Sequence, residues 1–255
     1  MGATEGNLVR IAVAGGTGLA GRLVVDRLQR DGHDPVVLAR ARGVDLMTGE
    51  GLAAALKGAD VVVDVTSVTT TSARKSVGFF GTATDNLLQA AQNAGVGHHV
   101  ALSIVGIERV KSAYYLGKIR QEELIRAGGV PWTILRATQF HEFADQVLSQ
   151  VPGPIAVVPV MRTQPIAVRE VAEHLCAIAT GAPQQMADEI AGPNVESLVD
   201  MARRLIKRRN QRRPVVPLRL PGHAARAAAT GALLPEGPGP RGTQTFDQWL
   251  REQGS

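Results

Sequence analysis

Tyr114 and Lys118 have the residue types and the spacing of a pair that handles a proton. They lie four residues apart in a stretch with helical spacing, so both side chains are expected on one face of a helix. A nearby ammonium group favours the ionised phenol and lowers the pKa of the tyrosine. Such a tyrosine can pass its proton to a carbonyl oxygen while a hydride arrives at the carbon, and Ser103 is a candidate for orienting that oxygen. The same lysine can hold the ribose of a nicotinamide cofactor.

A glycine-rich turn between residues 11–14 and residues 19–28 offers a place for such a cofactor. The apolar run before the turn predicts a strand, and the spacing after it predicts a helix. Gly15 allows a tight turn, Gly18 lets the backbone approach a pyrophosphate, and Gly21 lets the helix pack close to the strand. The N–H groups and the positive dipole end at the helix start then hold the phosphates. This context favours a dinucleotide site over a glycine turn that binds nothing.

Apolar runs and helical segments alternate along the first two thirds of the chain. This alternation predicts an α/β fold, a Rossmann-type doubly wound parallel sheet with right-handed crossovers. Ligands of such sheets bind at the carboxyl ends of the strands, where Ser103 falls. The expected strands are 11–14, 35–39, a stub at 43–46, 59–65, 99–104 and 132–136, and the expected helices are 19–28, 49–56, 81–94, 114–127 and 168–179.

The alternation loosens from Thr138 onwards, and prolines punctuate residues 152–160. A basic helix over 197–209 and a short helix near 246–250 follow. The segments within 138–255 are therefore expected to form a small lobe over the carboxyl edge of the sheet, where it would select the substrate.

Charge and hydropathy argue against several other classes of protein. The net charge is +5, and much of the positive charge lies within residues 203–213. The spacing of Leu198, Met201 and Leu205 leaves these charges on the opposite helical face, and no aromatic residues interleave with them, so no nucleic-acid partner is expected. No apolar run approaches the length of about 20 residues that a membrane span needs, and no signal peptide is apparent. A cytoplasmic location without membrane contact is expected.

Other single residues have structural interpretations. Cys176 is the only cysteine, which excludes an internal disulfide, and no ligand spacing of a metal site is present. It lies in an apolar helical segment and is expected to be buried. Glu122 and Glu123 are expected to form a solvated turn of a helix.

Five passages of the chain carry a family resemblance. They are VAGGTGLAGRLV (13–24), ADVVVDVTS (59–67), GTATDNLLQAAQNAGVGHHVALSIVG (81–106), YYLGKIRQEELIRAGGVPWTILRATQF (114–140) and QPIAVREVAEHL (164–175). Together they resemble the short-chain dehydrogenase/reductase superfamily, in its atypical branch of NmrA-like and NAD(P)H-binding proteins. The resemblance implies one NAD(P)-binding Rossmann domain over residues 1–255, with the cofactor across the strand ends. By analogy within this fold, paired surface helices can form a homodimer.

The resemblance also implies which residues contact the cofactor and the substrate. Arg40 follows the second strand, where an acidic residue would favour NAD, so NADP(H) is expected over NAD(H), with Arg42 as a second candidate for the 2′-phosphate. The plain alternative is a solvated surface arginine. Tyr115, Gln139 and Phe140 are implied at the substrate, and His141 is a further candidate for lining its pocket. The residues implied to bind the cofactor are Gly15, Thr17, Gly18, Leu19, Arg40, Asp45, Leu46, Val65, Thr66, Ser67, Lys118 and Thr138.

The expected function is NADPH-dependent reduction of a carbonyl, quinone or enone of a small organic molecule. Tyr114 would be the general acid, Lys118 would lower its pKa and hold the ribose, and Ser103 would assist. The alternative is a non-catalytic NmrA-type protein that senses NADP(H) and regulates a partner protein. Both share the glycine turn and Arg40, so Tyr114 and Lys118 favour the enzyme. A sugar-nucleotide epimerase is less favoured, because the C-terminal lobe is small.

Overall fold

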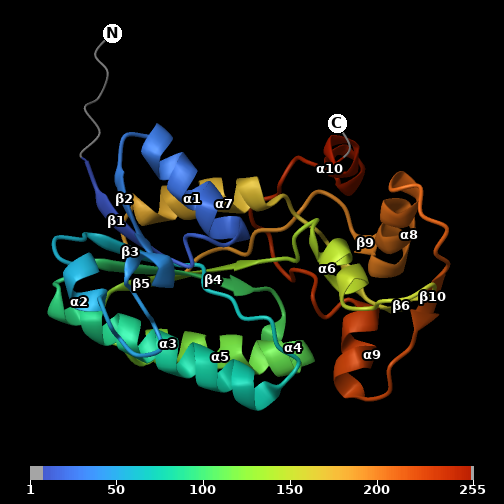
Figure 1. Ribbon diagram of the computed structural model, residues 1–255, viewed down its shortest axis with the longest axis horizontal. Helices are drawn as coiled ribbons and strands as arrows, with labels where there is room; N and C mark the ends of the chain where they lie inside the picture. Colours follow the sequence, from blue (N-terminus) through green and yellow to red (C-terminus); the bar gives the residue numbers. More distant parts are fainter. Residues whose placement is uncertain (1–7, 254–255) are drawn as a thin grey trace, which may run out of the picture.

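A six-stranded parallel sheet lies between two layers of helices (Figure 1). Its strands follow the spatial order β2-β1-β3-β4-β5-β8. The computed structural model describes residues 8–253. The chain order reverses at β1, which pairs with β2 on one side and β3 on the other. This arrangement confirms the expected Rossmann-type α/β fold. The strands are β1 (Arg10–Ala14), β2 (Asp34–Leu38), β3 (Val61–Asp64), β4 (His98–Ile104), β5 (Trp132–Ala137) and β8 (Gln185–Met186).

Helices cover both faces of this sheet. Helices α1 (Leu19–Arg30) and α7 (Val168–Ala179) pack together on one face, and α3 (Ala73–Asn93) and α5 (Ala113–Ala127) pack together on the other (Figure 1). Strands covered on both faces are apolar without alternation, as residues 11–14 show. The central strands are therefore buried along almost their whole length. Cys176, on α7, is buried as expected.

Residues 43–46 do not form the expected strand. Arg40–Arg42 form a 3₁₀ turn, η1, and the chain then passes through turns to the short helix α2 (Leu52–Ala55). Gly43 and Gly51 both have positive φ, which fits turns and not an extended strand. A further parallel strand would need a crossover of a dozen or more residues, which this segment is too short to supply. Strand β2 is consequently the edge of the sheet.

Helix α3 begins at Ala73, earlier than the expected start at residue 81. Ser72 caps the helix, because its side-chain oxygen accepts a hydrogen bond from the N–H of Lys75. Residues 73–80 therefore form the first turns of the helix. A short helix between β4 and α5, α4 (Ile107–Val110), was not expected from the sequence.

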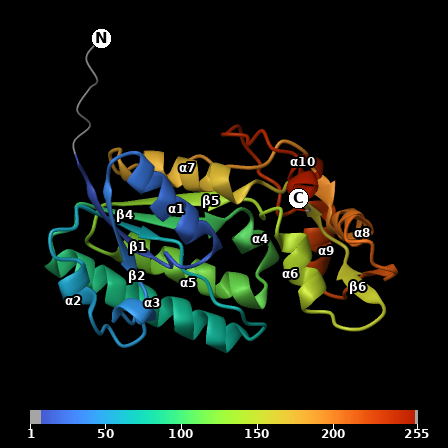
Figure 2. The ribbon, with the colours of Figure 1, turned by 45° about the horizontal axis from the view of Figure 1, so that its top comes forward.

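A second group of elements lies beside the carboxyl ends of the main strands (Figures 1 and 2). They surround their own apolar cluster, to which α8 contributes Leu198, Met201 and Leu205 from the face predicted for it. The lobe is built from two parts of the chain, one before α7 and β8 and one after them. Between these two parts, the chain returns to the main sheet and adds α7 and β8 to it. Its elements are α6 (Phe143–Ser149), β6 (Ala156–Pro159), β7 (Arg162–Thr163), β9 (Glu196–Ser197), α8 (Leu198–Arg208), β10 (Val215–Leu218), α9 (His223–Thr230) and α10 (Phe246–Glu252).

Strands of the lobe form two small sheets, a parallel pair of β6 with β10 and an antiparallel pair of β7 with β9. Across residues 8–253, no helix combines the length and the apolar character needed to cross a bilayer.

Candidate active site

The glycine turn after β1 brings three parts of the chain close together. Gly15 has a φ of +79°, and a Cβ built on it would lie 2.8 Å from the carbonyl oxygen of Val65. A Cβ on Gly21 would lie 2.1 Å from the carbonyl oxygen of Gly15. Only glycine fits at these two positions, because the turn packs against the loop after β3 and α1 packs against the turn. The turn, the start of α1 and the loop after β3 thus form one surface.

The start of helix α1 is open to a ligand. Its N-cap is Gly18, so no side chain caps the first turn, and the first turn holds no acidic residue. Thr17, Gly18 and Leu19 are exposed. Unpaired N–H groups at a positive dipole end bind phosphate, so this helix start fits the pyrophosphate of a dinucleotide.

Arg40 lies at the carboxyl end of β2 and is exposed. Neither Arg40 nor Arg42 forms an ion pair or a side-chain hydrogen bond with another residue in the part of the chain that the structure describes. The other residues implied at the adenosine end have local contacts: Asp45 accepts a hydrogen bond from the N–H of Met47 at 2.7 Å, and the carbonyl of Leu46 accepts one from the Asn86 amide at 2.8 Å. A free guanidinium beside an open turn fits an anionic group of a ligand.

The loop after β3 carries three residues implied to bind the cofactor. The N–H of Val65 donates to the carbonyl of Ala14 at 3.0 Å, and the N–H of Thr66 donates to the Asp64 carboxylate at 2.9 Å. Val65 and Thr66 are buried, whereas Ser67 is exposed. The loop is therefore anchored at its base and presents Ser67 at its end.

Tyr114 contacts this loop directly. Its hydroxyl lies 3.0 Å from the Ser67 hydroxyl, and its ring packs edge-on against Phe80 with the ring centres 5.5 Å apart. Burial raises the pKa of Tyr114, while the hydrogen bond from Ser67 lowers it. The expectation that Lys118 lowers this pKa is wrong for the structure, because the lysine is engaged elsewhere.

Lys118 is buried beneath the strand ends. Its ammonium group donates to the carbonyl of Leu102 at 2.6 Å and to the side-chain oxygen of Gln121, and it lies 4.9 Å above the centre of the Phe80 ring. Burial lowers the pKa of Lys118 to about 8, against the carboxylates of Asp64 and Glu122, which raise it. The lysine is thus held on the α5 side of the sheet.

Asp64 and Gln121 complete this buried group, and sequence reasoning missed both. The Gln121 amide donates to the Asp64 carboxylate at 2.8 Å. Two signals were available in the sequence: Asp64 interrupts an apolar strand, and Gln121 follows Lys118 at a spacing that places both on one helical face. Neither signal says that the two segments meet.

Ser103 lies on β4 and is 2 % exposed. Within residues 8–253 its hydroxyl has no hydrogen-bond partner. The structure therefore brings Ser67, and not Ser103, into hydrogen-bond contact with Tyr114.

The residues implied at the substrate occupy different surroundings. The Tyr115 hydroxyl accepts a hydrogen bond from the Gln139 amide at 3.4 Å, and Gln139 accepts one from the Thr163 hydroxyl at 2.6 Å. Burial raises the pKa of Tyr115 to about 12. Thr138 donates to the carbonyl of Gln164 at 2.6 Å, and Phe140 packs against the main core. The hydrogen bonds to Thr163 and Gln164 join the segment after β5 to the lobe.

His141 does not line an open pocket, contrary to expectation. It is fully buried, and a ring nitrogen lies 3.1 Å from the carbonyl oxygen of Gln244. The rings of Phe246 and Trp249 pack on it, with ring centres 5.9 and 5.8 Å away. Burial lowers its pKa to about 4. His141 thus fastens α10 to the end of β5.

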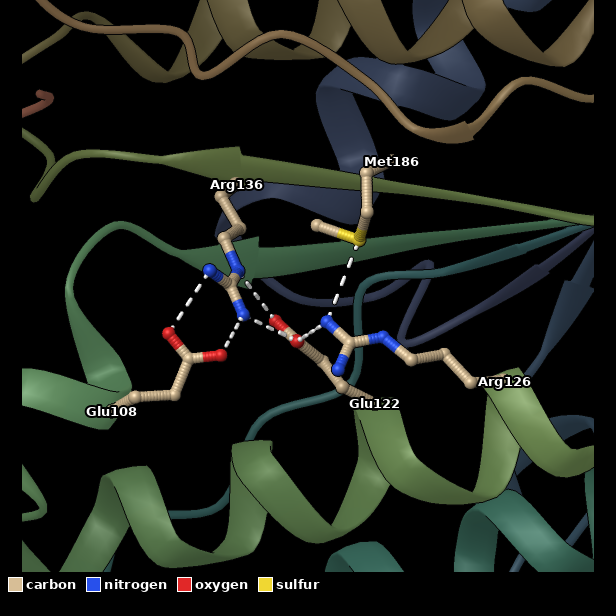
Figure 3. A network of polar contacts seen from close by, with 5 residues as sticks. All are labelled: Glu108, Glu122, Arg126, Arg136 and Met186. Atoms are coloured by element: carbon tan, nitrogen blue, oxygen red, sulfur yellow. Dashed lines mark hydrogen bonds and ion pairs between the residues drawn. The ribbon is translucent and has the colours of Figure 1, made fainter. Parts of the chain in front are cut away.

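Glu122 is buried, with 2 % of its surface exposed, so the expectation that it lies in a solvated helix turn is wrong. It pairs with Arg136 at 2.6 Å and with Arg126 at 2.6 Å (Figure 3). Arg136 also pairs with Glu108 at 2.5 Å, so one guanidinium joins α4, α5 and β5. Its neighbour Glu123 is exposed, as expected. The network fixes the helix that carries Tyr114 against the sheet.

Comparison with protein families matches residues 15–180 to a family described as NAD(P)H-binding. The chain belongs to this NAD(P)H-binding family. The expectation of an NAD(P)H-binding family is thereby confirmed, and the glycine turn described above belongs to an NAD(P)H-binding domain. No curated protein is detectably similar in sequence.

Solved structures share the fold of this NAD(P)H-binding chain at low identity. The NADPH-dependent quinone oxidoreductase of Escherichia coli, complexed with NADPH, has a TM-score of 0.73 at 18% identity, over 96% of this chain and 100% of the other. A dTDP-4-dehydrorhamnose reductase from Clostridium acetobutylicum has a TM-score of 0.71 at 13% identity, over 96% and 99%. UDP-glucose 4-epimerase from Thermus thermophilus, in complex with NAD, has a TM-score of 0.64 at 18% identity, over 96% and 93%. These likenesses show the fold alone.

Proposed function

We propose that the protein is an NADPH-dependent oxidoreductase that reduces a carbonyl, quinone or enone of a small organic molecule. One observation carries the proposal: the Tyr114 hydroxyl lies 3.0 Å from Ser67, in a loop that packs against Gly15 of the cofactor turn. A proton donor therefore stands beside the surface that fits a dinucleotide. The likeness to a quinone oxidoreductase complexed with NADPH is consistent with this chemistry.

Bound NADPH would supply a hydride to the substrate carbon. Leu19, at the uncapped start of α1, would hold its pyrophosphate, and Gly18, whose N–H donates to the carbonyl of Gly15 at 2.9 Å, would let the pyrophosphate approach the backbone. Lys118 would hold a ribose hydroxyl, because an ammonium group has three donors and the lysine uses two of them on Leu102 and Gln121.

Tyr114 would give the proton that a reduction consumes. The raised pKa keeps the phenol protonated at neutral pH, which is the form that a general acid needs. Ionisation of the phenol then occurs only as the substrate oxygen gains negative charge. Tyr115 and Gln139, which are hydrogen-bonded to each other, would border the substrate on the side of the lobe.

Arg40 supports NADPH over NADH. It is exposed at the end of β2, where dinucleotide-binding domains distinguish the two cofactors, and the described residues include no carboxylate paired with it. A guanidinium there would bind the 2′-phosphate with two hydrogen bonds.

One observation favours the alternative, a protein that binds NADP(H) to regulate a partner. Lys118 gives its hydrogen bonds to Leu102 and Gln121, so the phenol receives no help from the ammonium group. A protein that only senses NADP(H) needs the dinucleotide surface but no tyrosine with a lowered pKa.

The loss of NADPH absorbance with panels of quinones, aldehydes, ketones and enones tests the proposal. Turnover of one of these classes is expected, and Tyr114→Phe is expected to reduce kcat by about a hundredfold or more. The Kd of NADPH, measured by fluorescence, should stay unchanged in the variant, because the phenol does not bind the pyrophosphate. NADPH binding without turnover of any class would instead support the sensor.

A further inference from the structure

The hydroxyl group of Ser67 stands nearest to the Tyr114 phenol. The two oxygens are 3.0 Å apart, which is hydrogen-bond distance, and Ser67 is exposed at the end of its loop. The two residues come from distant parts of the chain, the loop after β3 and the first turn of α5. Their contact is therefore a product of the fold.

Asp64 holds these two parts at a fixed separation. One of its carboxylate oxygens accepts the N–H of Thr66 at 2.9 Å, which anchors the loop. The other accepts the Gln121 amide at 2.8 Å, which anchors α5 two turns beyond Tyr114. Asp64 is 1 % exposed, so the bridge is shielded from water. The Ser67 and Tyr114 hydroxyls are consequently held at hydrogen-bond distance from each other.

Two other candidates for a partner of the phenol, Lys118 and Ser103, form no hydrogen bond with it. The Lys118 ammonium group is bonded to Leu102 and Gln121. The Ser103 hydroxyl is buried, and no partner for it lies in the described part of the chain. Ser67 is thus the hydroxyl that the geometry offers to a substrate oxygen together with Tyr114.

We propose that Ser67 is a catalytic residue that works with Tyr114, the pair giving two hydrogen bonds to the substrate carbonyl oxygen. This inference rests on the proposed reductase function. The carbonyl carbon accepts the hydride from NADPH, its π electrons move to the oxygen, and that oxygen takes the Tyr114 proton. The products are the alcohol, NADP⁺ and a tyrosinate, which Ser67 stabilises as a hydrogen-bond donor until solvent returns the proton.

A titration of Tyr114 tests the pairing without any turnover. The chain has two tyrosines, so Tyr115→Phe leaves Tyr114 as the only phenol whose tyrosinate absorbance can be followed. In this background Ser67→Ala is expected to raise the pKa of Tyr114 by about one pH unit, and Ser67→Thr should restore it. Ser103→Ala is the matched control and should leave the pKa unchanged. Circular dichroism over the same pH range checks that each variant stays folded.

Kinetics of the otherwise unaltered chain give the second readout. Ser67→Ala is expected to lower kcat by about a hundredfold with a smaller change in KM, since the bond strengthens as charge develops on the oxygen. An unchanged Tyr114 pKa in Ser67→Ala, or a kcat equal to that of the wild type, would overturn the role of Ser67. If the wild type turns over no substrate but the Tyr114 pKa shifts, the pairing stands and the proposed reductase function fails.

Discussion

The Gln121 amide donates a hydrogen bond to the Asp64 carboxylate over 2.8 Å and so joins helix α5 to the end of strand β3. Gln121 also accepts a hydrogen bond from Lys118. A buried carboxylate and a buried ammonium are therefore linked through one neutral side chain. Charged groups at this depth are costly unless paired and hydrogen-bonded, which explains why both charged side chains bond to Gln121.

The buried ammonium predicts a specific dependence of stability on pH. The pKa of Lys118 is lowered to about 8, mainly by burial, from an ordinary value of 10.5. Between these values the unfolded chain binds more protons than the folded chain, so the free energy of unfolding rises with pH in that window. Relative to Lys118→Met, the wild type should gain roughly 3 kcal/mol across the window, as an upper limit.

Urea unfolding of both proteins at several pH values measures this difference. Other titrating groups contribute equally to the two chains and cancel. If the free energies of unfolding of the wild type and Lys118→Met changed in parallel from neutral pH to above pH 10.5, a lowered pKa of Lys118 would be contradicted.

Arg40 predicts the choice of cofactor. Arg40→Ala should weaken NADP⁺ binding by about ten- to a hundredfold and leave NAD⁺ binding nearly unchanged, because a charge-assisted hydrogen bond is worth about 1.5–3 kcal/mol. The thermal shift produced by each cofactor measures this preference. Arg42→Ala is the matched comparison, because Arg42 is the second candidate for this phosphate and is also exposed in η1. Equal stabilisation of the wild type by both cofactors would refute the assignment.

Gly21 predicts a steric limit on the cofactor turn. Gly21→Ala would place a Cβ 2.1 Å from the carbonyl oxygen of Gly15, so it should destabilise the fold by more than about 1 kcal/mol and weaken NADPH binding. Gly78 is the matched control, because it is also helical and a Cβ added there would meet no atom within 4 Å. Gly78→Ala should instead stabilise the helix by about 0.5–1 kcal/mol. Thermal unfolding and NADPH titration measure the two effects. Equal effects of Gly21→Ala and Gly78→Ala would contradict the close packing of Gly21 on Gly15.

Glu122 and Glu123 are neighbours, but we expect their removal to have very different effects on stability. Glu122→Ala removes a buried partner of Arg136 and should cost about 3 kcal/mol of unfolding free energy. Glu123→Ala removes an exposed carboxylate, 3.3 Å from Arg120, and should change stability by less than about 1 kcal/mol. Denaturant unfolding of the two variants compares them directly; similar losses would argue against the network of Figure 3.

The sequence predicted correctly those parts of the fold that depend on residues close together in the chain. The run 11–14, Gly15 and the helical spacing after Gly18 define a strand, a turn and a helix whose geometry each residue type favours on its own. The same holds for the buried face of α8, where Leu198 and Leu205 follow helical spacing. Such features need no knowledge of distant segments.

Contacts between distant segments set the parts that local pattern missed. Glu122 looks solvated by type, but Arg136 reaches it from β5. Ser67 and Tyr114 meet only because Asp64 and Gln121 join their segments. Residues 43–46 have apolar positions that suit a strand, but the path from β2 is too short for a crossover.

The order in which the lobe is assembled has a consequence for synthesis on the ribosome. Helix α6 and strand β6 emerge before α7 and β8, and their apolar partners on α8 and α10 emerge only afterwards. His141 likewise waits for Phe246 and Trp249 to cover it. The nascent chain therefore carries an incomplete apolar surface until residues 246–250 have been translated, and in this interval the surface is open to non-native contacts.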